Sequence, residues 1–181
     1  MNKEDAISIL EDYVESESLR KHCQAVAACM KHFAKKHNED GEKWEITGIL
    51  HDFDYEKFPE NHPMAGEEIL KEKGVAEDII RAIQSHANWS NVSRDSLMEK
   101  ILYAVDELSG FVVAVAYVRP NKMEGMKVKS VKKKLKDKSF AAKVNREEIK
   151  EAAEELGVEL GDLIQDVIEA LTNEAENLGL K

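Results

Sequence analysis

A histidine and an aspartate stand side by side at His51 and Asp52, directly after an apolar run that ends at Leu50. A further histidine, His62, precedes Pro63 later in the same stretch. Imidazole nitrogens and carboxylate oxygens are the ligands that divalent transition metals prefer. Since the chain has only 6 histidines, this stretch is the first place where the sequence indicates metal-dependent chemistry.

Three more polar residues fall where the apolar pattern predicts a buried helix face. His22 lies four residues before Val26 and seven before Cys29, so it borders the buried side of its helix. His86 follows a short apolar helix, and Asp106 interrupts the most apolar segment of the chain. An unpaired carboxylate buried there would be costly, so Asp106 needs a cation.

Side chains from separate segments are thus expected to converge on one interior, where a metal ion accounts for them together. Taken singly, each has a simpler interpretation. A lone histidine on an apolar face is more often a hydrogen-bonded core residue, and an aspartate within a helix is commonly exposed. The converging residues are His22, His51, Asp52, His86 and Asp106.

The elements that position these residues are predicted to be α-helices, because apolar residues recur every three or four positions and no strand pattern or repeat appears. We expect an all-α fold with a main body over residues 1–118, a basic segment over 119–146, and amphipathic helices over 147–181 that pack on the body. Pro63 is expected in the first turn of one helix, and Asn145 with Glu148 as a capping box. The expected helices cover residues 19–37, 43–50, 63–73, 75–85, 101–118, 145–156 and 160–171.

Length and composition suit one globular domain, since 181 residues with 43% hydrophobic and 34% charged residues can bury a substantial core. Cys23 and Cys29 are predicted to be reduced thiols in that core. The apolar segment 101–118 is interrupted by two acids, and nothing at the amino terminus resembles a signal peptide. We therefore expect a cytoplasmic protein that binds no membrane.

Charge is unevenly distributed along the chain. The net charge is −10, yet residues 119–146 hold 11 basic and 2 acidic residues, a local +9 that leaves −19 for the remainder. Such a balance favours a small phosphorylated partner over long nucleic acid, which the acidic remainder would repel. Arg119, Lys132 and Lys133 are candidates to bind substrate phosphates. The alternative is that this segment is a solvated surface.

The ordered set H…HD…H…H…D along a helical chain resembles the HD-domain superfamily of metal-dependent phosphohydrolases. The resemblance covers about residues 18–118 and implies an HD-domain helical bundle with a carboxy-terminal helical extension. The segment DELSGFVVAVAYVRP and the lysine-rich stretch after it are similar to those of a small group of bacterial predicted HD hydrolases. HDFDYE differs from the HDxxED pattern of the guanosine tetraphosphate hydrolases, and no HDIGK motif supports a cyclic di-GMP enzyme.

The resemblance also implies ligands for one or two divalent ions, drawn from Mn, Fe, Ni, Zn, Co and Mg. Asp52 would bridge the two ions. The four ligands of the basic site would be His22, His51, Asp52 and Asp106, and the extra ligands of a two-metal site His62 and His86.

The implied reaction is attack of metal-activated water on phosphorus, with a second ion about 3.5–4 Å away to hold a phosphoryl oxygen. Asp52 and Asp54 are the catalytic candidates. Asp54 would orient the water or protonate the leaving oxygen, or else is a solvated or capping aspartate. The sequence leaves open whether a nucleotide or another small phosphorylated molecule is cleaved, and whether the bond is a monoester, diester or pyrophosphate.

Two other functions stay open. In one, the protein is a non-catalytic, metal-containing module that binds or senses a nucleotide. In the other, the carboxy-terminal amphipathic helices form an interaction surface, and the protein is a homo-oligomer or docks a partner.

Overall fold

The computed structural model describes residues 1–181 and contains helices but no strand, which confirms the all-α prediction. It adds a helix at the amino terminus and one within the basic segment to those expected from the sequence. The elements are α1 (Lys3–Tyr13), α2 (Glu17–His37), α3 (Gly41–Leu50), α4 (Glu67–Glu72), α5 (Glu77–Ser85), α6 (Leu97–Tyr117), α7 (Val128–Leu135), α8 (Arg146–Leu156) and α9 (Leu160–Asn173), with short 3₁₀ turns η1 (Met64–Gly66) and η2 (Asn88–Ser90).

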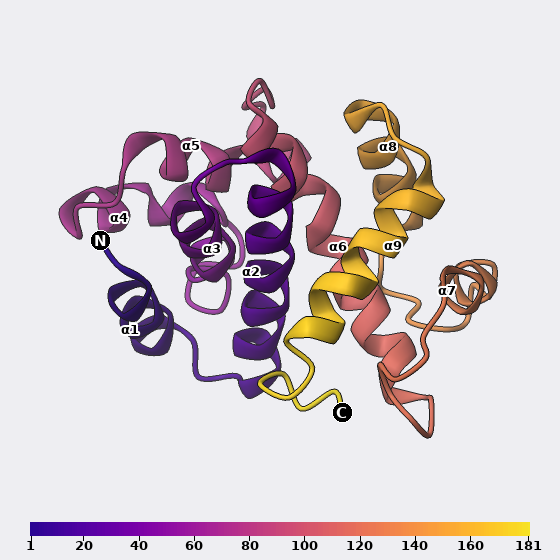
Figure 1. The fold of residues 1–181 in the computed structure, drawn as a ribbon. Coiled ribbons are helices and arrows are strands. Elements are labelled where there is room, and N and C mark those ends of the chain that lie inside the picture. The colour runs from indigo at the N-terminus through magenta and orange to yellow at the C-terminus, as the bar shows by residue number, and fades with distance from the viewer.

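Helix α2 stands at the centre of the molecule and separates two hydrophobic cores (Figure 1). On one side, Cys23 and Ala27 pack with α1, α3 and α5. On the other, Val26 and Met30 pack with α6, α8 and α9. Neighbouring stripes of one helix therefore pack into the two cores and join the two halves of the molecule.

The apolar stripe predicted on the last helix is buried within this chain. Leu163, Ile164 and Val167 of α9 are almost wholly covered, and they belong to the same core as Phe111 of α6. The chain then turns back so that Leu180, its penultimate residue, is also buried. The carboxy-terminal helices therefore complete the core of the main body.

Helix α3 approaches α2 very closely at Gly48. A Cβ atom placed on Gly48 would lie 2.5 Å from the Cα of Ala27 and 2.7 Å from its backbone nitrogen. Only glycine permits this approach of the two backbones. The contact fixes where along its length α3 packs against α2, and it thereby fixes the position of the residues that follow α3.

Two local expectations were wrong. Pro63 precedes the η1 turn, and α4 begins only at Glu67, because a 3₁₀ turn intervenes. The Asn145 side chain accepts from the backbone N–H groups of Glu147 and Glu148, as an N-cap should. The reciprocal half of the box, however, comes from a different helix: the backbone N–H of Asn145 donates to Glu107 Oε2 at 3.3 Å.

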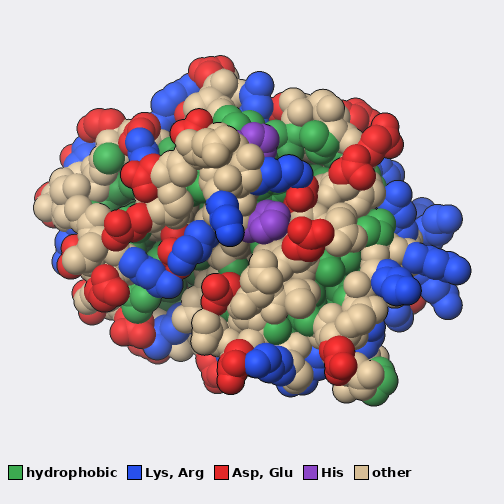
Figure 2. Space-filling view, viewed as in Figure 1, with side chains coloured by type: hydrophobic (Ala, Val, Ile, Leu, Met, Phe, Trp, Pro, Cys, Tyr) green, Lys and Arg blue, Asp and Glu red, His purple; other side chains and the backbone are tan.

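The basic segment is partly helical. The buried Val131 anchors α7 against the rest of the molecule, whereas Lys129, Lys132 and Lys133 of α7 are exposed. Lysine and arginine side chains gather at the right edge of Figure 2, where α7 lies in Figure 1. Cys23 and Cys29 are free and buried, and no helix has the length and apolar character needed to cross a membrane.

Candidate metal centre

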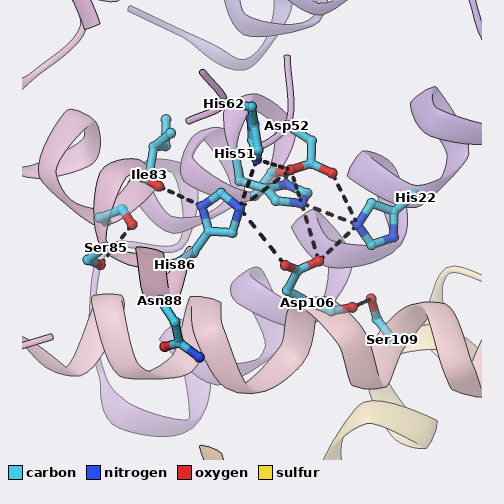
Figure 3. Close-up of polar contacts among 12 residues, drawn as sticks. His22, His51, Asp52, His62, Ile83, Ser85, His86, Asn88, Asp106 and Ser109 are labelled. Atoms are coloured by element: carbon cyan, nitrogen blue, oxygen red, sulfur yellow. Dashed lines mark hydrogen bonds and ion pairs between the residues drawn. The ribbon is translucent and has the colours of Figure 1, made fainter. Parts of the chain in front are cut away.

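Six polar side chains from five separate segments meet beside α2 (Figure 3). One comes from the second turn of α2 and one from the middle of α6. Two histidines occupy the residue directly after a helix, one following α3 and the other α5. Every ligand candidate predicted from the sequence is in this group: His22, His51, Asp52, His62, His86 and Asp106.

The first subset surrounds one point between α2, α3 and α6. His22 Nε2 lies 3.2 Å from His51 Nε2 and 3.0 Å from Asp106 Oδ1. Asp52 faces the same two histidines, with Oδ2 3.7 Å from His22 Nε2 and Oδ1 3.4 Å from His51 Nε2. Because ligand atoms bound at about 2.1 Å from one ion lie roughly 3–3.5 Å from each other, these separations suit a single cation.

The second subset consists of His62 and His86, which share Asp52 Oδ1 with His51 of the first subset. Asp52 Oδ1 is 3.1 Å from His62 Nε2 and 3.5 Å from His86 Nε2. The two imidazoles are 3.2 Å apart through their Nε2 atoms. Asp106 Oδ2 reaches to 4.0 Å from His86 Nε2. The two subsets thus share Asp52, and Asp106 borders both.

The remaining ring nitrogens explain why Nε2 faces inward. His51 Nδ1 lies 2.8 Å from the carbonyl oxygen of Gly48, and His86 Nδ1 lies 2.5 Å from that of Ile83. A carbonyl oxygen only accepts, so Nδ1 carries a proton in both rings, and in a neutral ring Nε2 presents a lone pair to the centre. Both carbonyls belong to the helix that the histidine follows, so the helix end fixes the ring.

His62 is held in the same way by a carboxylate. Its Nδ1 donates to Asp54 Oδ1 at 2.6 Å, while the edge of its ring faces Tyr55. Asp54 is fully buried behind His62, and its other oxygen, Oδ2, has no hydrogen-bond partner. The predicted catalytic role for Asp54 therefore does not fit its position, because it contacts the back of a ligand candidate and does not face the centre. Its geometry is that of a carboxylate that orients a metal-binding histidine.

The carboxylates of the cluster are stabilised by positive charge on their neighbours. Burial works against the charged form of Asp106, but hydrogen bonds with His22 and His51 outweigh it and hold the pKa of Asp106 well below its usual range. Burial likewise opposes protonation of His62, yet Asp52 and Asp54 raise the pKa of His62 to about 9. Without a cation, the site must take up protons to balance its carboxylates.

These residues fit divalent ions by their chemistry. When His62 and His86 are neutral, their Nδ1 protons are already donated, so two lone pairs face each other at 3.2 Å with no hydrogen between them. Such an arrangement is repulsive unless a cation lies between the nitrogens. The first ion would be held by His22, His51 and Asp52 together with the adjacent Asp106, and the second by Asp52, His62 and His86.

The three candidates for phosphate binding lie elsewhere. Arg119 donates to the backbone carbonyls of Lys122 and Glu124, so its guanidinium closes the turn after α6. Lys132 lies over Gly161 at the start of α9, and Lys133 is exposed on the same helix, α7. Figure 1 shows α7 at the right edge of the molecule, whereas α3 and α5, which precede three of the ligand candidates, lie to the left of α2. The expected contact with substrate is not supported, because α7 packs on α6 and α9 instead of folding over the site.

Comparison with known proteins gives one match. The family model described as HD domain matches residues 19–110, which contain all six ligand candidates. No curated protein and no solved structure matches the chain significantly.

Proposed function

The chain belongs to the HD domain family, a superfamily of metal-dependent hydrolases, and from that premise we propose that it is a phosphohydrolase with two divalent ions and a small phosphorylated substrate. The reaction would be attack of water on phosphorus. A nucleotide is the substrate type that we favour within this class.

One observation carries the proposal: Asp52 is shared by two groups of ligand atoms. A carboxylate whose oxygens lie 3.1–3.7 Å from two histidine pairs, His22 with His51 and His62 with His86, is the arrangement expected of a bridging ligand. Two ions bound there would supply an activated water and neutralise the charge of the phosphoryl group.

The protein's own groups have two tasks in this account. Asp54 and the carbonyls of Gly48 and Ile83 fix the histidine rings, so that the Nε2 atoms are arranged before an ion arrives.

The ligand side chains are also mostly covered, with His22 the most open at 23% exposure, so little bulk water reaches the centre. Access from the His22 side is therefore the route that we propose for substrate.

Hydrolysis of a panel of phosphomonoesters and phosphodiesters, with manganese, nickel or iron added to metal-free protein, tests the proposal. We expect turnover that requires the metal and is lost in His51→Ala. His37→Ala is the matched control, because His37 is exposed and lies outside every group of side chains that could hold a metal ion. Metal binding without turnover of any member would favour a non-catalytic sensor.

A further inference from the structure

A groove runs from His22 along the line where α2 faces α6. Its volume is about 650 Å³, and His22 forms one end while Tyr117, the last residue of α6, forms the other. Gly110 of α6 lies opposite the His22 ring. Since an α-helix rises 1.5 Å per residue, the stretch from Gly110 to Tyr117 is about 10 Å long. His22 is the one ligand candidate in the groove lining, so a group that extends past this histidine from a phosphate at the metal centre would lie along the groove.

The floor of the groove is apolar and its far end is aromatic. Ala25 of α2 with Val113 and Ala114 of α6 supply the floor. The Tyr117 side chain is 56% exposed, although it terminates the most apolar helix of the chain. An exposed aromatic face beside small apolar side chains suits a flat ring, which gains from stacking as well as from burial.

Free positive charge is scarce in the lining of this groove. It contains one lysine, Lys21, and that ammonium is paired with Glu17 at 2.7 Å. A second hollow on the other side of His22 is lined by Tyr55 and Glu56 and contains no lysine or arginine. A single phosphoryl group would be neutralised by the ions, whereas further phosphoryl groups would meet carboxylates.

We propose that the substrate is a phosphomonoester with one phosphoryl group and a flat ring system, and that Tyr117 stacks on this ring and determines specificity. The inference rests on the proposed function, because the ions at the His and Asp cluster hold the phosphoryl group. In this proposal the substrate-binding surface is the α2–α6 groove and not the basic segment that the sequence predicted. Tyr117 acts in binding and takes no part in the chemical step.

Binding of phosphonates, which are not hydrolysed, tests the inference without depending on turnover. Calorimetry on manganese-loaded protein should show the phosphonate analogue of adenosine monophosphate, whose ring lies well beyond its phosphorus, binding about tenfold more tightly than the phosphonate analogue of ribose 5-phosphate, which lacks the ring. Tyr117→Ala should remove this difference and leave metal content unchanged, while Tyr117→Phe keeps it. Val118→Ala is the matched control, since Val118 is the neighbouring residue, is 58% exposed and lies outside the groove lining.

Equal affinity of the parent for both phosphonates would overturn the inference, and so would a preference for the ring-bearing phosphonate that survives Tyr117→Ala. A preference that is lost in Tyr55→Ala would also overturn it, because the ring would then lie in the other hollow. Tighter binding of adenosine triphosphate than of the monophosphate at saturating manganese would overturn the single-phosphoryl claim. A preserved preference for the ring-bearing phosphonate without any hydrolysis would contradict the proposed reaction alone.

Discussion

Asp54 shows how far a single residue can be interpreted from sequence. Residue type and helical periodicity, both visible in a sequence, indicated five of the six residues that meet at the centre, and the resemblance to the HD-domain superfamily added His62. The partner of each histidine was not visible. Asp54 lies in a turn after α3, where no periodicity indicates which way a side chain points, and only the structure shows it behind His62.

Asp54→Asn should weaken the second ion selectively. The amide can still accept from His62 Nδ1, but it carries no charge and places an NH₂ group where Asp54 Oδ2 is buried without a partner. Loss of such an outer partner typically costs about 10–100-fold in metal affinity. Titration with manganese should therefore show one weakened ion and one unchanged ion. Equal weakening of both ions, or of neither, would contradict the assignment of Asp54 to His62.

At the scale of the elements, the α2–α3 contact has the sharpest consequence. Gly48→Ala should destabilise the protein by about 1–3 kcal/mol despite alanine's better helix propensity, because the added methyl meets the backbone of Ala27 and neither helix can yield locally. Gly48 also accepts from His51 Nδ1, so metal affinity should fall with stability. Chemical denaturation and metal titration measure both effects.

The control is Gly41→Ala in the first turn of the same helix. A Cβ at Gly41 would meet nothing within 4 Å, so this variant should be neutral or slightly more stable. If both variants behaved alike, the close approach at Gly48 would not matter.

Glu45 ties three helices together and should make stability depend on pH. Burial opposes its charged form, but Lys3 of α1 and Lys31 of α2 outweigh this and hold the pKa of Glu45 below its ordinary value. A lowered folded-state pKa stabilises the protein above the unfolded value, near 4.5, and this contribution disappears as pH falls through the folded value.

Glu45→Gln should accordingly cost about 1 kcal/mol at pH 7, since both lysines are half exposed and water weakens the pairs. The difference from the parent should shrink as pH falls below about 4.5. Denaturation at several pH values tests this, with Glu147→Gln, which removes an exposed pair with Lys150, as the control. A difference that grew in acid would contradict the sign.

The longer helices could be predicted from sequence, and the shorter or tightly turned ones less well. The apolar periodicity identified α2, α6 and α9 closely. Helix α1 was missed although Asn2 and Asp5 form a capping box there, and α7 was missed because a lysine-rich stretch with few apolar residues has little periodicity. Contacts between elements, such as Gly48 with Ala27, depend on the packing of distant segments and cannot be deduced from either segment alone.

At the scale of the whole molecule, one core extends well beyond the residues matched by the family model. Val112 and Val115 of α6 pack in the same cluster as Ile149 of α8 and Leu171 of α9. Removal of residues 119–181 would expose this face of α6. The shortened chain should therefore lose cooperative unfolding and near-ultraviolet circular dichroism. A chain of residues 1–118 that unfolds cooperatively and binds metal would show that the carboxy-terminal helices are dispensable.

The central claim is that six side chains hold two ions that share Asp52, and the number of metal ions per chain tests it most directly. Elemental analysis of manganese-reconstituted protein should give two ions per chain for the parent and for the His37→Ala control. In His62→Ala the count should fall to one, because only the second subset is broken. An equal count in His62→Ala and the parent would contradict the two-ion centre.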